Sequence, residues 1–207
     1  LDDLDCFSMF GTNSFNLVWE KVCAEVIDNQ LQKPIGGLRL PVPLAEQYRD
    51  MRHKKLIDLI DKPQWSGTAP NGEPFGKQAE DTLIPDLISI VNVDGDYQFI
   101  IFDAKYYNIQ LEHNKKLRGQ PGTESITKQY LYQLAYQPFV EAHQIGTVRN
   151  CFLMPTAAAE IVEKGTAALA MLRNWGLQDI QVRLLPADMM YRHYIDNTKI
   201  DIQSLNL

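Results

Sequence analysis

The stretch LIPDLISIVNVDGDYQFIIFDAKYY, residues 83–107, decides how this chain folds. Two runs rich in β-branched and aromatic residues, 83–93 and 97–105, flank the dipeptide Asp94-Gly95. Asp-Gly between two such runs favours a two-residue type I′ turn, in which both central residues adopt positive φ. Each run is apolar on both sides of its pleat, which is typical of strands buried on two faces. The sequence therefore predicts an antiparallel strand pair inside a covered sheet.

The predicted hairpin fixes which residues face each other. If Asp94 and Gly95 form the turn, the numbers of facing residues sum to 189, so Asp86 faces Asp103. Directly opposed residues of an antiparallel pair have Cβ atoms about 4.5–5.5 Å apart and project from the same face. Lys105 lies two residues beyond Asp103 and shares that face because side chains alternate along a strand. We expect two carboxylates and one ammonium group at one end of the pair.

Two opposed carboxylates in a mostly apolar sheet repel each other and are costly to desolvate. A divalent cation would explain them, because Mg²⁺ binds one or two carboxylates together with water and phosphate oxygens. The ammonium group of Lys105 would then hold an attacking water or stabilise charge developing on a phosphate. The alternative is an ordinary ion pair between Asp103 and Lys105, with Asp86 merely following Pro85 in a turn.

The rest of the chain alternates predicted helices, strands and loops. Apolar spacing and turn residues predict a helix over 14–29, a loop over 32–45, a helix over 46–61, a loose stretch without regular elements over 62–78, a polar loop over 106–124, a helix over 125–142, a strand over 147–154, a helix over 157–175, a strand over 178–185 and a short helix from about 186. We expect an α/β or α+β fold whose region 32–80 is an insertion or mobile loop.

Two predicted helices carry further polar candidates. Glu20 interrupts an otherwise apolar stripe on the first helix. Gln129, Gln133 and Tyr136 share one face of the helix over 125–142, with Lys128 alongside. The amides could orient water or phosphate. The alternative readings are a glutamate at the edge of the core and an ordinary solvated stripe.

The charge of the chain excludes a general attraction to nucleic acid, because 20 basic and 26 acidic residues leave a net charge of −6. Any DNA contact must come from local patches. Two segments are locally basic, and their candidate DNA-binding residues are Arg52, Lys54 and Lys55 in the first, and Lys115, Lys116, Arg118 and Lys128 in the second. Solvated surface is the alternative for both.

Composition and cysteine usage narrow the class of protein. The 207 residues are 45% hydrophobic and 22% charged, as in ordinary globular proteins, and contain no apolar run long enough for a membrane span. Three cysteines without a CxxC pair, and no basic-then-apolar leader, predict a cytoplasmic protein without disulfides. Because the chain starts at Leu1 rather than Met, we expect an upstream region to be missing.

Ile84-Pro85-Asp86, followed after the hairpin by Asp103-Ala104-Lys105, resembles the PD-(D/E)xK nuclease superfamily. Three further segments are similar, more narrowly, to the nuclease subunit of LlaJI-type restriction systems, which are themselves similar to McrBC. These segments are residues 10–20, the DAKYY sequence at 103–107 and Lys128-Gln129-Tyr130. The resemblance covers roughly residues 10–155.

The resemblance implies a restriction-endonuclease-like αβββαβ core in a single domain over 1–207, with a mixed central sheet flanked by helices. It implies that Asp86, Asp103 and the carbonyl of Ala104 bind Mg²⁺, with Mn²⁺ as a substitute, and that Glu20 is a supporting acid. Lys105 would be the catalytic lysine, and Gln129 or Gln133 an orienting amide. Cleavage of double-stranded DNA would leave a 5′-phosphate and a 3′-hydroxyl. An AAA+ GTPase of the McrB type would be the partner, and the long segment between Glu20 and Asp86 leaves the first core strand unplaced.

Three hypotheses therefore stand. The first is a Mg²⁺-dependent DNA endonuclease that forms the catalytic domain of a modular type II or type IV-like restriction enzyme. The second is a DNA-binding or assembly module that keeps the nuclease fold without catalysis. The third is a repair or transposition nuclease of the same superfamily. A homodimer is compatible with each, and none involves a membrane.

Overall fold

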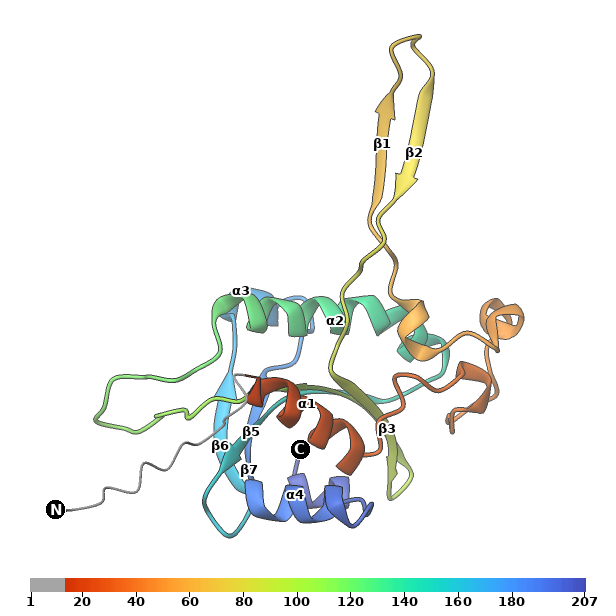
Figure 1. Cartoon of the computed structure of the whole chain (residues 1–207). Helices are drawn as coiled ribbons and strands as arrows, with labels where there is room; N and C mark the ends of the chain where they lie inside the picture. Colours follow the sequence, from red (N-terminus) through yellow and green to blue (C-terminus); the bar gives the residue numbers. More distant parts are fainter. Residues whose placement is uncertain (1–13) are drawn as a thin grey trace, which may run out of the picture.

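A computed structural model describes residues 14–207 and contains one five-stranded mixed sheet in the order β3-β4-β5-β7-β6, with helices on both faces (Figure 1). The helices are α1 (Phe15–Val26), α2 (Thr123–Ala142), α3 (Ala170–Arg173) and α4 (Ala187–Ile195). The strands of this sheet are β3 (Leu87–Val93), β4 (Asp96–Ala104), β5 (Thr147–Thr156), β6 (Val162–Ala167) and β7 (Ile180–Pro186). Strands β1 (Gln64–Thr68) and β2 (Pro74–Gln78) form a separate hairpin. Within the described part of the chain, no helix is long and apolar enough to cross a membrane.

The predicted hairpin at 83–105 is confirmed. Asp94 and Gly95 have φ values of 51° and 94°, as a type I′ turn requires. The register pairs Val93 with Asp96 and Leu87 with Phe102, which is the predicted sum of 189. This register places Asp86, directly before β3, next to the end of β4.

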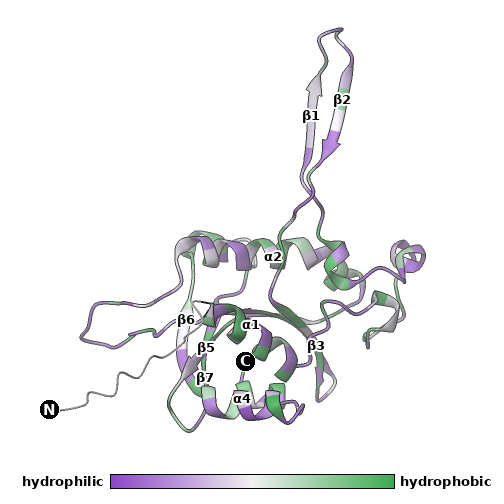
Figure 2. Ribbon diagram, viewed as in Figure 1, coloured by the Kyte–Doolittle hydropathy of each residue, from purple (hydrophilic) through white to green (hydrophobic). Residues whose placement is uncertain are grey.

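Helices α1 and α4 cover one face of the sheet and α2 covers the other (Figure 1). Alternate residues of β4 divide between the two cores: Ile100 and Phe102 pack with α1, whereas Phe99 and Ile101 pack with α2. Figure 2 shows β3 as largely hydrophobic, in agreement with its burial on both faces. The sheet is therefore the middle of three layers, as the apolar runs predicted.

The mixed α/β fold is confirmed, but the expected αβββαβ order is not observed. In the described chain, two strands of the main sheet, β3 and β4, precede α2, and three strands follow it. Strand β4 pairs with β3 antiparallel and with β5 parallel. The sequence analysis could not place the first core strand between Glu20 and Asp86. In the structure this region forms the β1–β2 hairpin and 3₁₀ turns, and it adds no strand to the main sheet.

Region 46–61 was predicted as a helix and is not one. Two 3₁₀ turns, Glu46–Met51 and Leu56–Leu59, replace it. The carbonyls of Arg52 and Lys54 accept hydrogen bonds from the N–H groups of Gly36 and Ile35 at 2.9 and 2.8 Å. Long-range backbone pairing thus takes the acceptors that a continuous helix would have used.

Two further predictions of local structure were wrong. Residues 62–78 contain strands because their prolines stand directly before β1, in the turn and at the first position of β2, where proline is tolerated, whereas Gly67 and Gly76 lie within the two strands. The predicted helix over 157–175 is replaced by β6 and the short α3. Pairing of β6 with β7 overrides the alanine-rich local preference, and Gly165, at φ 132°, adjoins the register irregularity in β6.

The segment from Leu31 to Ile60 packs on the α2 face of the sheet, and His143 holds it there. The buried His143 ring accepts a hydrogen bond at Nε2 from the N–H of Ala45 (3.1 Å), and its Nδ1 lies 2.7 Å from the carbonyl oxygen of Phe139. Because Nε2 accepts, Nδ1 carries the proton and the ring is neutral. Burial lowers the pKa of His143 despite the opposing effect of the Phe139 carbonyl.

We expect this histidine to make the fold sensitive to acid. The unfolded chain takes up a proton near the ordinary histidine pKa of about 6.5, whereas the folded protein does not. The free energy of unfolding should therefore fall as the pH drops below that value toward the lowered pKa of the folded state. Urea denaturation of wild type and His143→Gln across this range measures the difference.

His113→Gln is the matched control, because His113 lies in an exposed loop. The difference between wild type and His143→Gln should shrink as the pH falls. If that difference stays constant from neutral pH to mild acid, His143 is not the acid-sensitive group.

Candidate active site

Asp86 and Asp103 converge where β3 begins and β4 ends. An Oδ2 atom of Asp86 accepts a hydrogen bond from the N–H of Ala104 at 2.8 Å, so Asp86 is tied to the residue that follows Asp103. Nζ of Lys105 donates to Oδ1 of Asp103 at 2.7 Å. Odd-numbered residues of β4 face α2, which puts Asp103 on that side of the sheet, and Asp86 lies directly before β3. The predicted juxtaposition of the three residues is present.

Asp103 has a strongly raised pKa. It is 5% exposed, and burial raises its pKa. The neighbouring Asp86 raises the pKa further, through a hydrogen bond and through its charge, and these effects outweigh the opposing effect of Lys105. Asp103 therefore holds a proton more strongly than an ordinary aspartate does, and a positive charge bound beside both acids would lower its pKa.

Lys105 and Glu20 complete the charged group. Burial lowers the pKa of Lys105, but the carboxylates of Asp103, Asp86 and Glu20 outweigh it and raise the pKa overall. Burial and the charge of Asp86 raise the pKa of Glu20, which is half-buried on α1. Glu20, which comes from α1, thus interacts electrostatically with Asp86 and Lys105.

Tyr132 on α2 adjoins the acids and was missed by the sequence analysis. Its hydroxyl donates to the carbonyl of Ile84 at 2.9 Å, and both Asp103 and Asp86 act with burial to raise its pKa. The helical spacing of Gln129, Gln133 and Tyr136 contained the signal, because Tyr132 falls on the same stripe. Tyr132 fixes the segment that leads into Asp86.

The two candidate amides of α2, those of Gln129 and Gln133, differ in their hydrogen-bond partners. Oε1 of Gln133 accepts hydrogen bonds from Asn150 Nδ2 (2.7 Å) and from the N–H of Gln178 (3.2 Å), so its amide oxygen joins α2 to β5. Gln129 is fully buried, and neither Nε2 nor Oε1 has a hydrogen-bond partner in the structure. A buried amide without partners is costly, which makes Gln129 the better of the two candidates for an orienting role.

The candidate DNA-binding residues form two separate groups. Residues 52–55 lie on one side of the body, and the loop 106–122 projects from the other (Figure 1). Arg52, Lys54, Lys55, Lys116 and Arg118 are exposed, whereas Lys115 pairs with Glu112 at 2.7 Å and Lys128 with Glu124 at 2.6 Å. The loop 106–122 follows Lys105 directly and is therefore the basic segment nearest to the acids.

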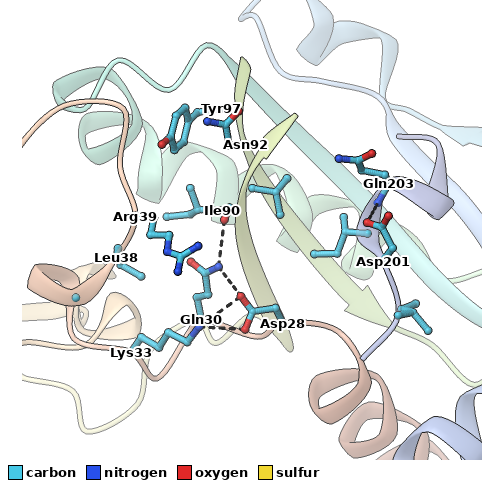
Figure 3. A pocket seen from close by; sticks show the side chains of 14 residues that line it. Asp28, Gln30, Lys33, Leu38, Arg39, Ile90, Asn92, Tyr97, Asp201 and Gln203 are labelled. Carbon is cyan, nitrogen blue, oxygen red and sulfur yellow. Dashed lines mark hydrogen bonds and ion pairs between the residues drawn. The ribbon is translucent and has the colours of Figure 1, made fainter. Parts of the chain in front are cut away.

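A pocket of about 680 Å³ lies at the other end of β3, away from the acids (Figure 3). Its polar groups bind one another: the Gln30 amide donates to Asp28 and to the carbonyl of Ile90, and Lys33 pairs with Asp28. None of Glu20, Asp86, Asp103 and Lys105 lines it. The candidate chemistry is therefore not in this pocket.

The donor set at the acids suits a hard divalent cation. Oxygen ligands from one or two carboxylates, with water and phosphate, are what Mg²⁺ binds, and Asp86 and Asp103 supply two adjacent carboxylates. In residues 14–207, no three histidine, cysteine, aspartate or glutamate side chains converge as a preformed cage. The site fits a cation completed by substrate and water better than a structural metal enclosed by protein.

Two substitutions of Asp86 separate its charge from its hydrogen bond. In metal-free protein, Asp86→Asn should be neutral or stabilising, because it removes repulsion from Asp103 and keeps an acceptor for the Ala104 N–H. Asp86→Ala leaves that buried N–H without a partner and should cost about 1–3 kcal/mol relative to Asp86→Asn. Urea denaturation in the presence of EDTA measures both. Marked destabilisation by Asp86→Asn would mean that Asp86 is instead part of a structural ion pair.

Comparisons with known proteins agree with the resemblance seen in the sequence. The BsuMI type II restriction enzyme component YdjA of Bacillus subtilis strain 168 is 28% identical over 200 residues, which cover 96% of this chain and 36% of that protein. The chain thus spans about a third of the length of this relative. No solved structure matches the chain. The model of the LlaJI restriction endonuclease family matches residues 47–185, a range that includes Asp86, Asp103 and Lys105 but not Glu20. The chain belongs to the LlaJI restriction endonuclease family.

Proposed function

We propose that this chain is the catalytic domain of a Mg²⁺-dependent DNA endonuclease in a restriction system. One observation carries the proposal: a buried aspartate, Asp103, is placed between a second carboxylate and a lysine at the end of a strand pair. Membership of a restriction endonuclease family supports nuclease chemistry. The raised pKa of Asp103 supports a site that needs a further positive charge.

Asp86 and Asp103 would hold Mg²⁺ or Mn²⁺, with the carbonyl of Ala104 and the carboxylate of Glu20 as supporting ligands. The bound cation would polarise the scissile phosphate and lower the pKa of a water molecule. Asp86 is already oriented by the N–H of Ala104, so ion binding requires little reorganisation of this carboxylate. Gln129, with its unpartnered buried amide, would orient water or a phosphate oxygen.

Lys105 acts as a cation in this proposal. The surrounding carboxylates raise its pKa, so the side chain is an ammonium ion at neutral pH and has no lone pair with which to remove a proton. It would instead hold the attacking water and stabilise the negative charge that develops on the phosphate. Its hydrogen bond to Asp103 fixes the position of Nζ for both tasks.

The DNA duplex would be held by local basic patches, since the net charge of −6 gives no general attraction. Lys116 and Arg118 lie in the loop that follows Lys105, together with Lys115 and, at the start of α2, Lys128. Arg52, Lys54 and Lys55 would contact the duplex at a second place, because they lie on the other side of the body.

We also propose that the domain works in an assembly with an AAA+ GTPase of the McrB type. The relative in Bacillus subtilis is named as a component of a restriction enzyme, which supports the need for other subunits. This chain covers 36% of that relative, so contact with the partner and a part of DNA target recognition would use regions of the protein beyond it.

Cleavage should depend on the buried ion pair. Asp103→Ala and Lys105→Ala should each lower the rate of plasmid cleavage in Mg²⁺ or Mn²⁺ by at least about 10²–10³-fold, because each removes a charge from the reacting centre. Agarose gels of nicked and linear plasmid measure the rate, with the complete enzyme and its partner subunits present.

Lys33→Ala is the matched control, since Lys33 and Asp28 form an ion pair of 3.0 Å at the exposed surface away from the acids. This variant should cleave at the wild-type rate. The assignment fails if the enzyme cleaves and both Asp103→Ala and Lys105→Ala retain that activity. Linear and circular substrates compared in the same assay separate an endonuclease from a repair exonuclease.

Metal binding separates an active nuclease from a DNA-binding module that only keeps the fold. Isothermal titration calorimetry should show Mn²⁺ binding to the wild-type protein, with loss of that heat in Asp103→Asn, which keeps the size of the side chain and removes its charge. Release of protons on binding should accompany it, because the raised pKa of Asp103 means that the ion displaces a proton. An absence of Mn²⁺ binding in wild type would favour the non-catalytic module.

A further inference from the structure

Strands β1 and β2 form a ribbon, residues 64–78, that projects from the body of the protein (Figure 1). Nearly every residue of the ribbon is exposed, and Trp65 is 70% exposed. A two-stranded hairpin by itself is marginally stable in water, so a ribbon of this kind gains from lying against another surface. In the described chain it pairs with no third strand.

The root of the ribbon is held together by hydrogen bonds and is joined to the candidate active site by the segment 79–86. The N–H of Ala79 donates to the carbonyl of Pro63 at 2.9 Å, and the Thr82 hydroxyl donates to the carbonyl of Asp61 at 2.6 Å. The strand then continues through Ile84, which Tyr132 holds, into Asp86. Figure 1 shows this leg descending from β2 into β3. A duplex positioned at Asp86 would therefore meet the segment that carries the ribbon.

The two faces of the ribbon differ in chemistry. The register pairs Gln64 with Gln78, Ser66 with Gly76 and Thr68 with Pro74, so that the polar side chains of one face, which also carries Pro74, are those of Gln64, Ser66, Thr68 and Gln78. We call these four residues the amide-hydroxyl face. The opposite face carries Trp65, Phe75 and Lys77, and the Phe75 ring lies over Gly67, where an added Cβ would be 2.9 Å from it.

Charge on the ribbon restricts what it can bind. Neither strand contains a carboxylate, in a protein with 26 acidic residues, and Lys77 is the one charged residue of the two strands. Glu73 in the turn and Glu80 at the root flank the strands. One cation is too few to grip a phosphate backbone. Amides and hydroxyls on an uncharged face are instead suited to hydrogen bonds with base edges, where glutamine pairs with adenine and serine or threonine with any base.

We infer that the ribbon enters the major groove of the DNA duplex next to the cleavage site, with its amide-hydroxyl face against the base edges. The major groove is about 12 Å wide and admits a two-stranded ribbon, and five residues per strand give a length of roughly 17 Å. The inference rests on the proposed function, because it places the duplex at Asp86 and Asp103. It gives the ribbon a role in the choice of sequence.

The test uses the full-length protein in a Lys105→Ala background without metal, so that cleavage does not interfere with binding. A fluorescein-labelled duplex pool with a randomised core is selected on this protein and sequenced, and the most enriched duplex becomes the probe. Gln64→Ala/Gln78→Ala should weaken its binding by about tenfold or more in fluorescence anisotropy. The slope of log affinity against log salt should stay the same, because phosphate contacts are kept.

Two further variants complete the design. Trp65→Ser/Phe75→Ser changes the other face of the same ribbon and should leave the affinity unchanged. Replacement of residues 64–78 by two glycines should weaken binding at least as much as the double alanine variant. The two ends can be joined because the N–H of Ala79 lies 2.9 Å from the carbonyl oxygen of Pro63. Circular dichroism checks that each variant is folded.

Three results would overturn the inference: no enriched sequence in the pool, unchanged affinity after removal of the ribbon, or a loss confined to the aromatic variant. The last two would point to a protein partner on Trp65 and Phe75. Failure of the proposed function is distinct from each of these, since it appears as wild-type protein that neither binds Mn²⁺ nor cleaves DNA, whereas the binding assay needs neither metal nor cleavage.

Discussion

The candidate site depends on one hydrogen bond between a backbone N–H and a carboxylate. The N–H of Ala104 donates to the Asp86 carboxylate and holds it against the end of β4, directly beside Asp103. Both acids are thereby kept at a distance at which they repel, in a sheet whose neighbouring residues are apolar. Burial and the neighbouring Asp86 raise the pKa of Asp103, and the proposed cation would offset this unfavourable placement of two acids.

Helices on both faces of the sheet supply residues near the acids. Helix α2 supplies Tyr132, which fixes the approach to β3, and Gln129, whose buried amide has no partner. Helix α1 supplies Glu20 and also Trp19, whose Nε1–H donates to the carbonyl of Leu153 on β5 at 3.0 Å. Both faces of the sheet thus contribute to one end of β3 and β4. The ribbon precedes β3 and the loop 106–122 follows β4, so both are joined in the chain to this end of the strand pair.

Prediction from the sequence succeeded where a signal was local. Asp94-Gly95 and its flanking strands specified a register, and the register located Asp86 and Asp103 correctly. Prediction failed where remote parts of the chain compete for backbone hydrogen bonds. Residues 46–61 lose their helix to pairing with residues 35–36, and residues 162–167 become a strand because β7 offers an edge. Gln129 and Gln133 were indistinguishable in the sequence, because only their neighbours in β5 and the loop before β7 determine which amide is satisfied.

The sequence by itself determined the hairpin, the burial of its two faces, the opposition of two acids beside a lysine and the resemblance to a restriction nuclease. These properties follow from side-chain alternation and turn geometry, which act over a few residues. The tertiary structure alone decided that Glu20 on α1 interacts electrostatically with Asp86 and Lys105, that Tyr132 adjoins the acids, that residues 62–78 project as a ribbon, and that the sheet has the order β3-β4-β5-β7-β6. Those outcomes depend on contacts between segments far apart in the chain, for which a single sequence contains no local signal.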